Sequence, residues 1–183
     1  MSTFDDRSGR ALLVIDVQGG VVYDAFRRDE VVANVATLVE KARSAGVPVV
    51  WVQHNEPEMP IGSDYWQLVD GLSPATNEPR VDKQFRSSFD DTDLDDVLAR
   101  LGVGELVICG AQTNYCVRHT THSALDRGYD VTLVSDAHTT SDGEFAGRPV
   151  SAQSVIDEQN STCSGYRLPG RQCDVITTAE AFA

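Results

Sequence analysis

The sequence predicts a three-layer, doubly wound α/β fold, in which a mostly parallel sheet has helices on both faces. Three observations predict it. Short apolar runs alternate along the chain with stretches of helical spacing. The runs are nearly continuous rather than alternating, which is typical of strands buried on both faces of a parallel sheet. No repeat, low-complexity tract or linker interrupts the 183 residues, so we expect a single domain over 1–183.

The individual elements follow from these patterns in chain order. The predicted strands are apolar runs at residues 11–16, 47–54, 105–110, 129–136 and about 173–177. The predicted helices have apolar residues at helical spacing within 31–42, 94–101, 117–125 and, more weakly, about 149–160. Thr92 with Asp95 can cap the start of the second helix. Glycines suited to end the first three helices lie at Gly46, Gly102 and Gly128.

The segment from His54 to Thr92 stands apart from this alternation. It contains four prolines and only a short helical pattern, near residues 63–71. Segments of this length in compact domains are usually functional or disordered. Because it carries Trp66, Phe85 and Phe89, we expect this segment to pack against the domain.

Composition and charge limit the classes of partner. The formal net charge is −13 and the sequence pI is about 4.5, which argues against nucleic acid and against anionic membrane surfaces. No apolar run approaches the ~20 residues of a membrane-spanning helix. The first ten residues lack the apolar stretch of a secretion signal, so we expect a cytoplasmic protein with four free thiols and a small-molecule substrate.

Candidate catalytic residues lie at the predicted carboxyl edge of the sheet, where open parallel sheets place their sites. Asp16 ends the first strand, and Cys116 follows the third. Lys83 belongs to the long segment that leaves the second strand at the same edge. A carboxylate that leaves an apolar strand is costly to bury unless it is paired, and Lys83 is its natural partner. The three residues together supply a base, a cation and a nucleophile.

Cys116 falls in the first turn of the predicted helix that follows the third strand and has its apolar residues within 117–125, with Thr113 and Asn114 as candidate caps. Unpaired backbone N–H groups there favour an anion, so we expect a lowered thiol pKa and a reactive nucleophile. The alternative is a small hydrophobic packing residue. Cys109 lies inside a strand and is expected to belong to the core.

These residues carry a resemblance to the isochorismatase-like cysteine hydrolase superfamily over roughly residues 10–180. The matching stretches are "LLVIDVQ" (12–18), "VDKQFRSSF" (81–89), "GAQTNYCV" (110–117) and "ALDRGYDVTLVSDA" (124–137). The resemblance implies a sheet of about six strands. It also implies an Asp–Lys–Cys triad at Asp16, Lys83 and Cys116, no cofactor, and a homo-oligomer (dimer or tetramer).

The resemblance further implies a cis peptide bond at Ala111–Gln112 and an oxyanion hole made by the backbone N–H groups of Gln112 and Cys116. Residues expected to contact the substrate are Gln18, Gln53, His54, Trp66, Phe85 and Tyr115. Gln112 stands where the family usually has a small residue, and Asn114 where it often has an acid. The expected reaction is hydrolysis of a C–N bond in a small amide, carbamoyl compound or lactam, through a thioester.

Several alternatives remain at this point. His119, three residues after Cys116, could form a Cys–His pair. A metal site is disfavoured, because His54 is the only histidine before His119. Asp136 and His138 could be a ligand pair or a hydrogen-bond network. The turn "DVQGGVV" lacks the glycine pattern of nucleotide-binding folds. An isochorismatase-type or a catalytically silent small-molecule-binding member of the same fold is the alternative function.

Overall fold

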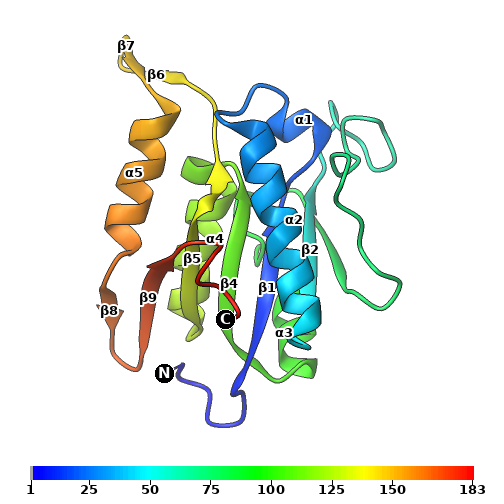
Figure 1. Cartoon of the computed structure of the whole chain (residues 1–183), viewed down its shortest axis with the longest axis vertical. Coiled ribbons are helices and arrows are strands. Elements are labelled where there is room, and N and C mark those ends of the chain that lie inside the picture. Colours follow the sequence, from blue (N-terminus) through cyan, green and yellow to red (C-terminus); the bar gives the residue numbers. More distant parts are fainter. Residues whose placement is uncertain (1) are drawn as a thin grey trace.

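The computed structural model describes residues 2–183 and confirms the predicted fold class. Its central sheet has seven strands in the order β3-β2-β1-β4-β5-β9-β8 (Figure 1). Neighbouring strands are parallel throughout, apart from the antiparallel pair β9–β8. The strands are β1 (Gly9–Ile15), β2 (Val49–His54), β3 (Arg80–Lys83), β4 (Val103–Ala111), β5 (Asp130–Thr139), β8 (Tyr166–Leu168) and β9 (Arg171–Ile176).

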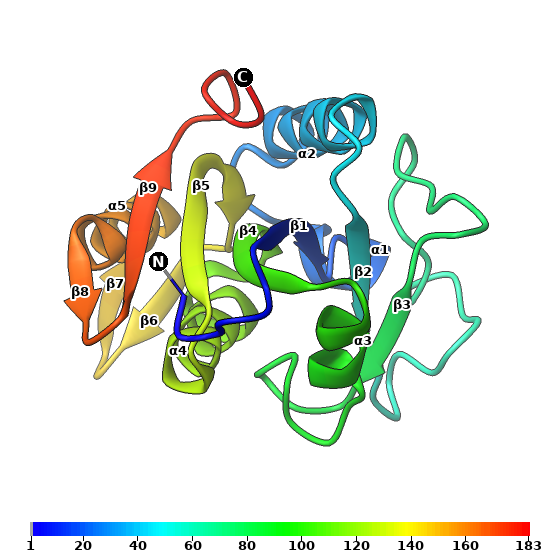
Figure 2. The same cartoon turned by 90° about the horizontal axis from the view of Figure 1, so that it is seen from below.

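Helices cover both faces of the sheet, as the view from below shows (Figure 2). They are α1 (Gly19–Val22), α2 (Arg28–Ser44), α3 (Leu94–Arg100), the π-helical turn η1 (Thr113–Val117), α4 (Arg118–Arg127) and α5 (Ala152–Cys163). One apolar core lies between α2 and the sheet, and a second lies between the sheet and α3 and α4. A separate hairpin, β6 (Gly143–Phe145) with β7 (Arg148–Val150), projects beyond the sheet (Figure 1). No helix in residues 2–183 is long and apolar enough to cross a membrane.

Most predicted elements are present, with two corrections in the long segment. The predicted helical pattern near 63–71 is wrong: these residues form turns, and Leu68 instead makes an isolated β-bridge with Gln18. Strand β3 was not predicted, because it has only four residues and buries only alternate ones. The long segment packs against the domain as predicted, since Met59, Val69, Leu72 and Phe89 are buried. Of the other two aromatic residues that suggested it, Trp66 is half-buried and Phe85 is 52% exposed.

Helix ends also differ from the predictions in detail. The last long helix runs over Ala152–Cys163 rather than about 149–160, because the Ser151 side chain caps it by accepting a hydrogen bond from the Ser154 N–H. At α3 the N-cap position is Asp93, without a side-chain cap. Thr92 still accepts a bond from the Leu94 N–H, at 3.3 Å.

Gly110 allows β1 and β4 to approach closely at the carboxyl edge. Its φ is +124°, and a Cβ atom there would lie 2.0 Å from the Ile15 carbonyl oxygen. The pairing register of β4 with β5 also shifts between Ile108 and Gly110. The strand end that leads to Cys116 therefore depends on a residue without a side chain.

A second set of contacts holds the other end of β3. Both Glu78 carboxylate oxygens accept bonds from the Arg43 guanidinium, at 2.7 and 2.8 Å. Glu78 Oε2 also accepts from Trp51 Nε1 at 2.7 Å and from the Ala75 N–H at 2.8 Å. We call Arg43, Glu78, Trp51 and Ala75 the Glu78 clamp. It ties the end of the long segment to α2 and β2, just before β3 begins.

Candidate active site

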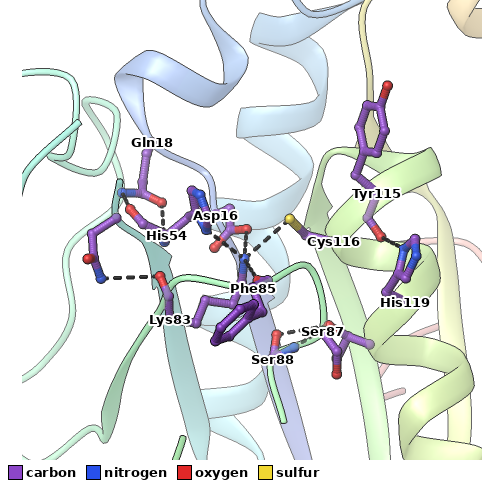
Figure 3. A network of polar contacts seen from close by, with 12 residues as sticks. Asp16, Gln18, His54, Lys83, Phe85, Ser87, Ser88, Tyr115, Cys116 and His119 are labelled. Carbon is purple, nitrogen blue, oxygen red and sulfur yellow. Dashed lines mark hydrogen bonds and ion pairs between the residues drawn. The ribbon is translucent and has the colours of Figure 1, made fainter. Parts of the chain in front are cut away.

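The sheet brings Asp16, Lys83 and Cys116 together at its carboxyl edge (Figure 3). Asp16 directly follows β1, Lys83 is the last residue of β3, and Cys116 lies in η1 after β4. Asp16 has a φ of +50°, a left-handed conformation that Asp tolerates better than most residues. Lys83 is in register with His54 of β2. The three residues therefore come from the carboxyl ends of β1, β3 and β4, with β2 between β1 and β3 in the sheet.

The Lys83 ammonium is the centre of the site. Its Nζ atom lies 2.6 Å from Asp16 Oδ2, 3.2 Å from Cys116 Sγ, 3.2 Å from the Phe85 carbonyl oxygen and 3.4 Å from His54 Nδ1. Both side chains of the Asp16–Lys83 pair are fully buried. Burial opposes the charge on Lys83, but Asp16 and Cys116 outweigh it and raise the pKa of Lys83. Lys83 is therefore a cation at neutral pH.

Asp16 is placed to accept a proton. Apart from the Lys83 contact, neither of its buried oxygens receives a well-aligned hydrogen bond from any group in residues 2–183. A carboxylate that serves only structure is usually saturated by N–H donors. Asp16 keeps lone pairs for a proton donor, and the neighbouring donor is the Cys116 thiol, with which it interacts.

The expected lowering of the Cys116 pKa is wrong. Burial and then the Asp16 carboxylate raise the pKa of the thiol to about 12, and Lys83 only partly offsets them. The predicted caps are also absent, because Thr113 Oγ1 contacts His138 Nδ1 at 2.9 Å and Asn114 Oδ1 accepts from Thr140 at 2.7 Å. The thiol is therefore protonated at neutral pH, and its nucleophilic form requires proton transfer to a base.

Two residues expected to contact substrate are structural supports. Gln18 is fully buried, and its amide donates to the carbonyls of His54 and Trp66 and accepts from the His54 N–H. Gln53 is 3% exposed and donates to the same Trp66 carbonyl at 3.0 Å. Both amides fix the long segment over the ends of β1 and β2. Their hydrogen-bonding groups are therefore largely occupied within the protein and are not free for a substrate.

The other predicted contact residues keep some exposed surface, and His54, Phe85 and Tyr115 lie around Lys83 and Cys116 (Figure 3). Phe85 and Tyr115 are 52% and 40% exposed. His54 and Trp66 are half-buried. Arg86, which the sequence did not single out, lies over the Tyr115 ring with 4.6 Å from its guanidinium carbon to the ring centroid. In the sequence, the only indication of this contact is that Arg86 lies close to Lys83 and Tyr115 lies next to Cys116.

The peptide bond Ala111–Gln112 is cis, as the resemblance implies. The Gln112 side chain turns away from the nucleophile and donates to the Val21 carbonyl at 3.3 Å. Within residues 2–183, the Gln112 N–H makes no hydrogen bond to the backbone. That leaves it available to a ligand beside Cys116.

Neighbouring polar residues have other partners. His119 Nδ1 lies 2.8 Å from the Tyr115 carbonyl oxygen and points away from the triad, which disfavours a Cys–His pair (Figure 3). Asp136 accepts two bonds from Thr178, so it belongs to a hydrogen-bond network. Cys109 is fully buried in the core, as predicted. Among residues 2–183, no three His, Cys, Asp or Glu side chains are grouped to hold a metal ion.

Sequence reasoning missed Asn55, which fixes the backbone of Lys83. Its N–H and its side-chain amide both donate to the Lys83 carbonyl, at 2.9 and 3.1 Å. Its side-chain oxygen accepts from Gln84. The only signal in the sequence is a polar residue directly after a strand, which is common at any strand end.

Comparison with known proteins places this geometry in a family. The family model for the isochorismatase domain matches residues 10–148. Streptothricin hydrolase from Streptomyces noursei is 37% identical over 181 residues, covering 96% of this chain and 71% of that protein. An isochorismatase family protein from Bacillus subtilis is 34% identical, covering 94% of this chain and 97% of its own length.

Solved structures agree with the sequence relatives. The crystal structure of an isochorismatase from Pseudomonas putida superimposes with a TM-score of 0.85 at 29% identity, covering 94% of this chain and 89% of that one. A hydrolase of the isochorismatase family from Chromobacterium violaceum also gives 0.85, at 26% identity, covering 100% and 96%. Fold and relatives together define a hydrolase with a doubly wound α/β architecture. The chain belongs to the isochorismatase family.

Proposed function

We propose that this protein is a cysteine amidohydrolase that cleaves the C–N bond of a small amide, carbamoyl compound or lactam through a thioester. The observation that carries the proposal is the contact of the buried Lys83 with the buried Asp16 on one side and the partly exposed Cys116 on the other. Lys83 Nζ lies 2.6 Å from the carboxylate and 3.2 Å from the sulfur. The three residues together supply a nucleophile (Cys116), a base (Asp16) and a fixed cation (Lys83) within one site.

The first half of the reaction forms the thioester. Asp16 takes the Cys116 proton while the sulfur attacks the amide carbon, so the costly thiolate exists only as it reacts. Lys83 offsets the negative charge that passes between Asp16 and Sγ. The backbone N–H groups of Gln112 and Cys116 stabilise the oxyanion. Protonated Asp16 then gives its proton to the leaving nitrogen, the C–N bond breaks and the amine departs.

The second half returns the enzyme to its starting state. Asp16 removes a proton from water, and the water oxygen attacks the thioester carbon. The C–S bond breaks, the acid is released, and Asp16 returns the proton to the sulfur. The net change is amide plus water to acid plus amine. No oxidant, metal or cofactor enters this balance.

The substrate class rests on the relatives and on the nucleophile. A relative 37% identical over almost all of this chain is a streptothricin hydrolase, so a lactam is the first amide to test. Cys116 also favours acyl transfer over vinyl-ether cleavage, since a thiol forms an acyl intermediate readily. Isochorismatase-type chemistry and silent small-molecule binding are the outcomes that would replace the proposal.

The test is a substrate panel with matched nucleophile variants. δ-Valerolactam, N-carbamoylglycine, maleamate and streptothricin are incubated with wild type, Cys116→Ala and Cys116→Ser, and products are followed by mass spectrometry. We expect the wild type to hydrolyse at least one amide and both variants to lose turnover. Acid quenching is expected to trap a mass increase on Cys116 equal to the acyl group. Full activity of Cys116→Ala would overturn the proposal.

The expectations of a cytoplasmic homo-oligomer, dimer or tetramer, stay predictions. Sedimentation of the purified full chain at several concentrations measures the assembly state directly. Because the net charge is −13, the measurement should include physiological salt to screen repulsion between copies.

A further inference from the structure

His138 is a buried titratable side chain that the proposed mechanism does not use. It lies in β5, one residue before the strand ends, and is 1% exposed. Its Nδ1 atom lies 2.9 Å from Thr113 Oγ1, and its Nε2 atom lies 2.9 Å from Asn160 Oδ1. The ring therefore joins the turn that carries Cys116 to helix α5.

The hydrogen bonds of Asn160 fix the tautomer of His138. Asn160 Nδ2 donates to the Ser135 carbonyl at 3.3 Å, which leaves Oδ1 facing the ring. Because Oδ1 can only accept, Nε2 carries the proton and Nδ1 has a free lone pair. The Thr113 hydroxyl then donates to Nδ1. This tautomer is assigned from the heavy-atom network.

The surroundings keep the ring neutral. Burial lowers the pKa of His138, and the opposing effects of Asn160 and Asp136 are smaller. A cavity of about 250 Å³ beside the ring is lined by the charged residues Arg27, Glu30, Asp136 and Asp157, which include both signs. At neutral pH, Nδ1 therefore stays an acceptor for Thr113.

Two side-chain contacts anchor the turn that Thr113 opens: Thr113 with His138, and Asn114 with Thr140. Thr113 is fully buried, and no side chain caps the start of η1. Within residues 2–183, the partner of its hydroxyl is His138. Cys116 lies three residues later on the same five-residue turn. The position of Thr113, the first residue of the turn, therefore contributes to where the sulfur lies relative to Asp16 and Lys83.

We propose that His138 is a positioning residue for the nucleophile. It holds Thr113, and through Thr113 the turn bearing Cys116, at the distance from Asp16 and Lys83 that proton transfer and attack require. His138 acts through Thr113 and touches neither the triad nor the substrate. The inference rests on the proposed function, because it takes Cys116 as the nucleophile.

Two matched pairs of variants test the geometry. Thr113→Val keeps the shape and removes the donor, whereas Thr113→Ser keeps the hydroxyl. His138→Asn places an acceptor near the position of Nδ1, whereas His138→Gln places its amide near Nε2 and loses the Thr113 bond. A displacement near 1 Å can cost about a hundredfold in rate, so we expect Thr113→Val and His138→Gln to lose roughly ten- to a hundredfold in kcat. Thr113→Ser and His138→Asn should keep most of the wild-type kcat. The KM should change little in all four variants.

Thr178→Val is the control for a purely structural loss. Thr178 is also buried, and its hydroxyl donates to Asp136 at 2.8 Å rather than to the nucleophile turn. The variant keeps the Thr178 N–H bond to the same Asp136 oxygen, so the carboxylate near His138 stays held. We expect it to lower the melting temperature about as much as Thr113→Val, with kcat unchanged. Rates are measured on the panel amide with the highest turnover, below every variant's unfolding transition. Equal kcat losses in Thr178→Val and Thr113→Val, or full kcat in Thr113→Val, would overturn the inference.

Two further measurements separate this inference from the proposed function. Long-range ¹H–¹⁵N NMR of wild type should show His138 protonated at Nε2 alone, and a proton on Nδ1 would overturn the assignment. Iodoacetamide labelling of Cys116 needs no substrate turnover. Because the pKa of Sγ depends on Asp16 and Lys83, the labelling rate should change by at least about threefold in Thr113→Val and stay near wild type in Thr113→Ser and Thr178→Val. Equal labelling rates in Thr113→Val and wild type would overturn the inference even if no panel amide is hydrolysed.

Discussion

Two ion pairs lie at opposite ends of strand β3, and they are built differently. In the Glu78 clamp, before the strand, donors from Arg43, Trp51 and Ala75 bind both carboxylate oxygens. At the other end, Asp16 contacts the Lys83 ammonium and keeps oxygens without further well-aligned donors. The saturated carboxylate is tied into structure, whereas the unsaturated one can accept a proton. Hydrogen-bond saturation thus separates a structural acid from a candidate base in this protein.

The largest expected effect is that of Asp16→Asn. Losing the general base should lower turnover by about 10²–10⁴-fold. Because Asp16 raises the pKa of Cys116, the same change should speed iodoacetamide labelling of Cys116 at pH 7. Activity assays and labelling rates measured on one preparation check both directions. Full turnover of Asp16→Asn would contradict the role of Asp16 as base, and slower labelling would contradict its effect on the pKa of the Cys116 thiol.

Gly110→Ala should damage the carboxyl edge that carries the site. The added Cβ would lie 2.0 Å from the Ile15 carbonyl oxygen, at a φ of +124°. We expect the free energy of unfolding to fall by about 3–5 kcal/mol, the range of severe backbone and packing defects. Gly46→Ala is the control, since Gly46 also has a positive φ but nothing within 4 Å of its added Cβ. Urea denaturation of both variants measures the difference, and equal losses would contradict the steric argument.

Glu78→Gln should weaken the clamp while leaving catalysis unchanged. We expect the free energy of unfolding to fall by about 1.5–3 kcal/mol, the usual cost of losing hydrogen bonds to a charged group. The Arg43 guanidinium is exposed enough to bind water instead, which limits the loss. Kinetics at a temperature where both proteins are folded should give equal kcat. A large loss of kcat would show that the two ends of β3 are coupled.

The clamp also predicts an acid dependence. Burial alone would raise the pKa of Glu78, but bonds from Arg43, Ala75 and Trp51 lower it from 4.5 to about 2. Its contribution to stability is therefore full above pH 4.5 and is lost as the pH falls toward 2. Urea midpoints between pH 6 and pH 3 should converge for wild type and Glu78→Gln. A constant difference over that range would contradict the assignment.

The smallest expected effect is a loss of stability at alkaline pH, when the Cys116 thiol ionises. The folded-state pKa of Cys116 is about 12, above the 9.0 of an unperturbed thiol, so the folded protein holds this proton more tightly than the unfolded chain. Stability from this group is complete below pH 9 and is lost as the pH rises toward 12. Cys116→Ala should reduce the slope of stability against pH between 9 and 10.5. An unchanged slope would mean that the thiol is more easily ionised than its surroundings indicate.

Much of the fold was predictable because its signals are local. Runs such as residues 11–16 and 105–110 are apolar on both faces, since both faces of a parallel sheet are covered. Strand β3 gives no such signal, because only Val81 and Lys83 of its four residues are buried. The structural roles of Gln18 and Gln53 were equally hidden, since they depend on where the long segment crosses the sheet.

The class of fold and the kinds of side chain at the carboxyl edge follow from local sequence patterns, because periodicity and strand ends depend on neighbouring residues. The triad was found through a resemblance of ordered motifs. Only the tertiary structure decided that Lys83 touches both Asp16 and Cys116, since a short edge strand delivers it beside β2. It also decided the sign of the Cys116 pKa shift. Burial and the Asp16 carboxylate depend on residues distant in the chain and raise this pKa, whereas the local argument from the helix terminus predicted a lower one.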